Sequence, residues 1–207
     1  MLKNRYEYML ALVSVIKPKK IIEVGISRGI RASQLIRLAR NYNSKIEYIG
    51  FDVFDSKDMQ FHKMVGNGKK VASKKQIHDL LIQYCDNVNL FEGTTEETLW
   101  GKKIKGDLVF IDGDHRIESI KKDFESLKHS QLVVLDDYYI NESYNEFDRN
   151  FYGCNQLISN LNENEYCISP PSEVLPEIRL AFFSYNKKLI EFIKKAFEKL
   201  ESAPPSI

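Results

Sequence analysis

Four acidic side chains stand in two short clusters of the sequence. Residues 110–115 are Phe-Ile-Asp-Gly-Asp-His, and residues 134–138 are Val-Leu-Asp-Asp-Tyr. Each cluster ends a short apolar run typical of a buried strand. If the two strands are neighbours, Asp112 lies near Asp136 and Asp137, where unpaired carboxylates repel one another unless a cation joins them. We therefore expect these three aspartates to bind a divalent metal, most simply Mg²⁺, with Ca²⁺ or Mn²⁺ as alternatives, because hard oxygen ligands suit these ions better than Zn²⁺.

Some of these acids have a plainer explanation. Aspartate is favoured at the first position of a helix, where its carboxylate accepts hydrogen bonds from free backbone N–H groups. This alternative is stronger for Asp114 and Asp137 than for Asp112 and Asp136.

A glycine-containing turn follows an earlier apolar run. Residues 23–29 are Glu-Val-Gly-Ile-Ser-Arg-Gly, and a stretch with helical periodicity comes next. Glycines let a ligand approach the backbone closely, and a helix N-terminus offers free N–H groups, although such a turn also arises for steric reasons alone. Asp52 ends the next apolar run, 27 residues after Gly25. An acid at this separation is placed to bind ribose hydroxyls, which favours a nucleoside cofactor; Asp55 is the alternative ligand.

The elements that must position these residues alternate between strand and helix. We expect strands over 20–25, 46–51, 88–91, 107–111, 132–135, 166–169 and 178–183, and helices over 6–16, 30–40, 71–84, 117–128, 150–161 and 187–200. Such alternation predicts a doubly wound α/β fold, with a mostly parallel, seven-stranded Rossmann-like sheet covered by helices on both faces. Because the last two strands are separated by a Pro-Pro turn and not by a full helix, we expect one of them to run antiparallel.

Chain length favours one domain over residues 1–207. Within it we expect a leading helix in residues 1–18, a candidate lid over residues 54–70, and a frayed tail over residues 202–207.

The bulk composition excludes several classes of partner. A formal net charge of +1 gives no global field for nucleic acid, and no run approaches the roughly 18 apolar residues of a membrane span. The N-terminus does not resemble a signal peptide. Cys85, Cys154 and Cys167 show no CxxC spacing and fit reduced, partly buried thiols, so we expect a cytoplasmic protein.

Taken in order, the turn at residues 23–29, Asp52, the DGDH stretch and the DDY stretch resemble class I S-adenosylmethionine-dependent methyltransferases. The resemblance spans residues 20 to 140 and is closest to the small, metal-dependent O-methyltransferases of the catechol type and of the macrolide or aminocoumarin sugar type. It implies metal ligands at Asp112, Asp136 and Asp137. It also implies that Glu23, Gly25, Gly29 and Asp52 bind the cofactor. We expect the cofactor site to include further residues as well: Ile26, Ser27, Val53, Gly93, Thr94 and Asp112.

Methyl transfer from a sulfonium requires an acceptor oxygen that is aligned and that loses its proton. A metal holding two substrate oxygens does both. His115 stands where related enzymes place a basic residue, and an ordinary pKa near 6.5 suits a general base; a contact to cofactor or water at a helix start is the alternative. We therefore expect His115 and Asp112 to be catalytic. The sequence departs from the family at Arg31, where relatives often have a small hydroxyl residue.

The expected acceptor is a small molecule with a hydroxyl group, and a homodimer is an open alternative to a monomer. Trp100, Tyr138, Tyr139 and Tyr144 are candidates to line the acceptor pocket or to pack elsewhere. The main rival function is an NAD(P)-dependent oxidoreductase, which shares the glycine turn but needs no carboxylates after two later strands. A non-catalytic, cofactor-binding relative is the other rival, and the intact acids and His115 argue against it.

Overall fold

The computed structural model describes residues 2–56, 71–140 and 151–202. Of the candidate lid, only the short 3-10 helix η1 (Phe54–Ser56) falls within these ranges. The rest of that segment, Tyr144 and residues 203–207 lie outside the described residues.

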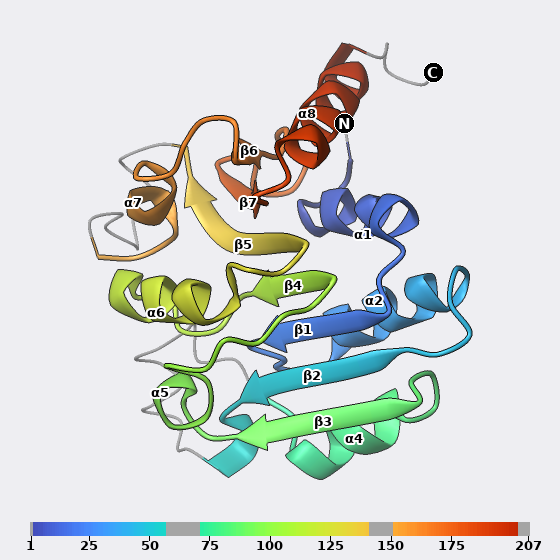
Figure 1. The fold of residues 1–207 in the computed structure, drawn as a ribbon. Coiled ribbons are helices and arrows are strands. Elements are labelled where there is room, and N and C mark those ends of the chain that lie inside the picture. The colour runs from blue at the N-terminus through green and yellow to red at the C-terminus, as the bar shows by residue number, and fades with distance from the viewer. Residues whose placement is uncertain (1, 57–70, 141–150, 203–207) are drawn as a thin grey trace.

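Seven strands form one sheet in the order β3-β2-β1-β4-β5-β7-β6 (Figure 1). Strands β1 to β5 are parallel, and β7 runs antiparallel to both β5 and β6. The predicted fold class, including one antiparallel strand near the C-terminus, is confirmed. The bounds are β1 Lys20–Val24, β2 Glu47–Asp52, β3 Asn87–Glu92, β4 Leu108–Ile111, β5 Leu132–Tyr139, β6 Tyr166–Ile168 and β7 Ile178–Phe183.

Helices cover both faces of this sheet. Side chains of α1, α2, α4 and α8 share one apolar cluster with one face, and those of α6 and α7 share a second cluster with the other face. The described helices are α1 Tyr6–Ile16, α2 Ile30–Arg40, α4 Lys74–Leu81, α5 Thr95–Thr98, α6 Ile117–Leu127, α7 Asn155–Ile158 and α8 Lys187–Ser202.

Four elements differ from the sequence prediction, and one of them, the short helix α5, was not predicted at all. Helix α4 begins only after Ser73, which forms a capping box with Gln76, and so it is shorter than the expected 71–84. Helix α7 covers four residues of the expected 150–161. Strand β5 runs four residues past the expected end, to Tyr139, with a register shift against β7 between Leu135 and Tyr138.

The cysteines are buried and form no disulfide, as their spacing predicted. No helix in the described part of the chain is both long enough and apolar enough to cross a lipid bilayer.

Candidate active site

A cleft of about 720 Å³ opens at the edge of the sheet where the parallel strands end. This is the edge toward which the arrowheads of β1 to β4 point in Figure 1. Ligands of open α/β sheets collect at this edge. The cleft is lined by nearly all of the predicted site residues: Gly25, Ser27, Asp52, Val53, Gly93, Thr94, Asp112, His115, Asp136 and Asp137.

The glycine turn lies directly against the loop that follows β4. Gly25 has a φ of +85°, and a Cβ atom there would lie 2.0 Å from the carbonyl oxygen of Asp112. Only glycine fits both constraints. The Asp52 carboxylate holds the same turn, since one of its oxygens accepts the N–H groups of Ile26 at 2.6 Å and Ser27 at 2.8 Å. The turn is therefore fixed in place beside the cleft.

Three predicted cofactor residues do not line the cleft. Glu23 is 1% exposed and accepts a hydrogen bond from the Tyr48 hydroxyl at 2.6 Å. Burial raises the pKa of Glu23 to about 8, so this carboxyl is mostly neutral at pH 7 and supports the sheet from inside. The Ile26 side chain is in the core, and Gly29, with a φ of +72°, faces Ile77.

The three acids come together because β4 pairs with β5, and Asp112, Asp136 and Asp137 all line the cleft. The sequence prediction placed Asp136 and Asp137 after a strand, but both lie within β5. Successive residues of a regular strand point to opposite faces. Here the register shifts and Asp137 adopts a φ of +57°, so that both neighbouring carboxylates reach the same cleft.

Asp136 is held by the start of helix α1. The Arg5 guanidinium makes a two-pronged contact, from Nε to Oδ1 at 2.6 Å and from Nη2 to Oδ2 at 2.9 Å. The Tyr6 hydroxyl donates to Oδ2 at 2.8 Å, and the N–H of Asp137 donates to Oδ1 at 2.8 Å. An ionised carboxylate offers about four acceptor positions, and these four hydrogen bonds use them.

Asp137 pairs with His115 through the ring Nδ1. Burial lowers the pKa of His115, but the hydrogen bond and negative charge of Asp137 outweigh burial and raise that pKa to about 9. The pKa of His115 therefore lies above the ordinary value near 6.5, in the direction that favours the protonated ring at neutral pH.

The predicted metal site is not found. Within the described ranges, no group of three or more His, Cys, Asp or Glu side chains is arranged to hold a metal ion. The physical reason is that Arg5 and His115 already neutralise Asp136 and Asp137. Burial and the charge of Asp136 raise the pKa of Asp112 well above its usual range. The residues present do not fit a divalent ion.

Asp114 also lines the cleft, but it is not the helix cap of the plainer alternative, because α6 begins after Arg116 without a side-chain cap. Its Oδ1 accepts the N–H of Arg116 at 3.0 Å, and its Oδ2 accepts the Ser119 hydroxyl at 2.7 Å. Asp114 therefore holds the turn that precedes α6 and contacts the first turn of that helix through Ser119.

Sequence reasoning missed the contribution of the N-terminal segment. Arg5, Tyr6 and Arg31 line the cleft, and the Tyr6 ring lies 4.6 Å from the Arg5 guanidinium carbon and 4.0 Å from that of Arg31. Nothing in the sequence around Arg5 indicates that it pairs with Asp136, which lies 131 positions away. The only available sign was Arg31, which departs from the family pattern.

Some of the aromatic residues predicted as candidates for the acceptor pocket line the cleft, and others do not. Trp100 and Tyr139 line the cleft, and the Trp100 ring N–H donates to Asp123 Oδ1 at 2.7 Å. Tyr138 does not line the cleft, and instead packs against the apolar cluster beneath α6.

Comparison with protein-family models identifies the fold's family. A model described as "Methyltransferase domain" matches residues 22–138, more than half of the chain. The chain belongs to this family. The match covers the glycine turn and all three acids of this methyltransferase domain, but it begins after Arg5 and Tyr6.

Solved structures share the fold of this methyltransferase. A putative O-methyltransferase from Klebsiella pneumoniae has a TM-score of 0.58 at 15% identity, over 89% of this chain and 81% of that chain. The O-methyltransferase TomG from Streptomyces achromogenes, solved with SAM, has a TM-score of 0.58 at 12% identity, with the same coverage. An O-methyltransferase from Bacillus cereus, solved with SAH, has a TM-score of 0.54 at 13% identity, over 86% and 79%. Among curated proteins no sequence match is found.

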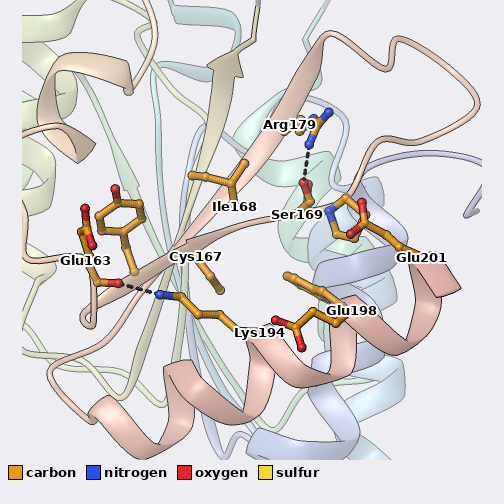
Figure 2. A pocket seen from close by; sticks show the side chains of 11 residues that line it. Glu163, Cys167, Ile168, Ser169, Arg179, Lys194, Glu198 and Glu201 are labelled. Carbon is orange, nitrogen blue, oxygen red and sulfur yellow. Dashed lines mark hydrogen bonds between the residues drawn. The ribbon is translucent and has the colours of Figure 1, made fainter.

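The methyltransferase has a second, smaller hollow of about 390 Å³ between β6 and α8 (Figure 2). Lys194 crosses it to the backbone oxygen of Glu163 at 2.6 Å, and Arg179 donates to the backbone oxygen of Ser169 at 3.4 Å. None of the predicted site residues lines this hollow.

Proposed function

We propose that this methyltransferase uses S-adenosylmethionine to methylate a hydroxyl oxygen of a small molecule. One observation carries the proposal: the glycine turn, Asp52 and the His115–Asp137 pair all border one cleft. The similar folds solved with SAM or SAH, and described as O-methyltransferases, support this choice of cofactor and acceptor atom.

The cofactor side of the cleft is the wall formed by Gly25, Ser27 and Asp52. The cofactor, when bound, supplies a methyl group on a positively charged sulfur. Gly25 lets a ligand approach the backbone, and Asp52 offers a carboxylate for ribose hydroxyls. The volume of about 720 Å³ lies within the usual range for a cofactor-sized site.

We place the acceptor beside the His115–Asp137 pair. Trp100, Tyr139 and Ile178 line this cleft. We assign Asp137 to hold the imidazole through Nδ1, which leaves Nε2 for the acceptor proton. When neutral, His115 would take the proton of the acceptor hydroxyl, and the cofactor, when bound, would supply the methyl group to that oxygen from its sulfonium sulfur. A base of pKa about 9 is well matched to a phenol of pKa about 10.

No step is assigned to a divalent metal, because the acceptor positions of Asp136 are used by Arg5, Tyr6 and the Asp137 N–H.

The test is a transfer assay with methyl-labelled SAM and a panel of catechols, simple phenols, sugars, amines and thiols. We expect label in an O-methyl product. His115→Ala should lower kcat by about 10²- to 10⁴-fold, the usual contribution of a general base. His78→Ala, which removes an exposed histidine on α4, is the matched control and should leave the rate unchanged. Label found only on nitrogen or sulfur acceptors would refute the assignment of the acceptor atom.

A further inference from the structure

The acidic edge of the cleft already holds a cation that belongs to the chain. We propose that Arg5 supplies the positive charge that Asp136 and Asp137 require, so that the site works without a divalent metal ion. The inference goes beyond the proposed function and rests on it only for the reaction that the site performs.

The hydrogen-bonding positions of Asp136 are already occupied. This side chain is 2% exposed, and its two oxygens receive two N–H groups from Arg5, the Tyr6 hydroxyl and one backbone N–H. A metal ion would have to displace the guanidinium to reach either oxygen. The displaced Arg5 would then be a charge without its partner, with a side chain only 12% exposed.

Asp137 is engaged in the same way. One oxygen faces His115 Nδ1, and the other lies 3.4 Å from Arg5 Nη2. Of the three acids, this leaves only Asp112 to offer a metal. Cations such as Mg²⁺ and Ca²⁺ take six or more oxygen ligands, and one carboxylate supplies few of them.

Arg5 is built into the fold and is not a loose surface side chain. It immediately precedes α1, whose Tyr8 and Met9 are buried in the core. Its neighbour Tyr6 packs edge-on against Phe110 of β4, with ring centroids 6.0 Å apart. A guanidinium matches a carboxylate in two-pronged geometry and keeps its charge at every physiological pH. The charge at this edge is therefore permanent.

The test is a Mn²⁺ titration of the full chain, with the free ion followed by electron paramagnetic resonance. We expect no saturable binding to the wild type up to about 1 mM. Arg5→Ala removes one hydrogen bond from each oxygen of Asp136, together with the guanidinium charge, and should bind Mn²⁺ at least about tenfold more tightly than the wild type. Adding Asp136→Asn to that variant should remove the gain. Arg37→Ala, which removes an exposed arginine of α2, is the matched control and should behave as the wild type.

Stoichiometric Mn²⁺ binding by the wild type at micromolar concentration, lost in Asp136→Asn, would overturn the inference. So would a folded Arg5→Ala protein that binds no more Mn²⁺ than the wild type. If Arg5→Ala does not fold, the wild-type titration decides, together with the methyl-transfer rate in EDTA and in Mg²⁺, which should be equal. SAH binding is measured in the same samples; its absence would end the proposed function, while the Mn²⁺ titration would still decide this inference.

Discussion

At the scale of residues, the chemistry of the cleft depends on pairings that residue types alone do not reveal. The sequence predicted that Asp112, Asp136 and Asp137 would meet, and they do. It could not show that Asp137 would adopt a left-handed backbone or that His115 would face it. The spacing of residues predicts that the three carboxylates lie close together, but which positive groups neutralise them depends on side-chain geometry.

The His115 pKa is the first prediction at this scale. NMR titration of ring-labelled protein should give a value of about 9, and Asp137→Asn should lower it by about one unit or more, because the neutral amide no longer stabilises the imidazolium. If His115 is the base, the methyl-transfer rate rises with pH up to about 9, since the neutral ring is the active form. A His115 that titrates near 6.5 in both proteins would contradict the pairing.

Glu23 gives a prediction about stability. Burial raises the folded-state pKa of Glu23 from 4.5 to about 8. The contribution of this carboxyl to the free energy of unfolding is therefore fully present below pH 4.5 and is lost as the pH rises to about 8 and above. In Glu23→Gln this loss of stability does not occur, because the amide does not ionise. Between about pH 5 and 8, the free energy of unfolding of the variant should gain roughly 3 to 4 kcal/mol relative to the wild type.

Urea unfolding at several pH values measures this difference. Glu125→Gln, at a 61% exposed side chain on α6, is the control and should track the wild type. A gap between Glu23→Gln and the wild type that does not change with pH would mean that Glu23 is charged in the fold.

At the scale of elements, the strands were predicted better than the helix ends. A buried parallel strand is a short apolar run, and such runs located β1 to β4 to within a residue or so. The exit of β5 was misplaced because two aspartates look like the end of a strand, whereas a bulge carries them inside it. Helix α4 is shorter than predicted because Ser73 caps its start.

The contact between the turn after β1 and the loop after β4 predicts the effect of Gly25→Ala. The new Cβ would lie 2.0 Å from the Asp112 carbonyl oxygen, at a φ of +85°. Thermal unfolding should show a loss of about 3 kcal/mol or more, together with weakened SAH binding. Gly101→Ala is the matched control, because its φ is +78° but no atom lies within 4 Å of the added carbon. It should lose only about 1 kcal/mol, the cost of the left-handed backbone. Equal losses in the two variants would show that the close contact is unimportant.

At the scale of the whole molecule, residues at the start of α1 contact the acids that the sheet brings together. Arg5 and Asp136 are 131 positions apart, and no periodicity predicts that pair. The family match covers residues 22–138, so it includes the acids and His115 but not Arg5, which pairs with Asp136.

This link predicts a coupling between α1 and β5. Arg5→Gln leaves Asp136 buried without its cation and should lower the free energy of unfolding by about 3 kcal/mol. The double variant Arg5→Gln, Asp136→Asn removes both charges and should recover part of that loss. Urea unfolding of the four proteins in the cycle gives the coupling, and additive losses would argue against an ion pair that matters in solution.

The most direct test of the account is isothermal titration calorimetry of the full chain with SAH, and with NAD as the rival nucleoside cofactor. The proposed methyltransferase should bind one SAH per chain, with a Kd of about 1–100 μM. Asp52→Ala should weaken this binding about tenfold or more, through loss of the ribose contact and of the hydrogen bonds that hold the glycine turn. NAD should give no binding heat. Saturable binding of NAD with none of SAH would contradict the central claim.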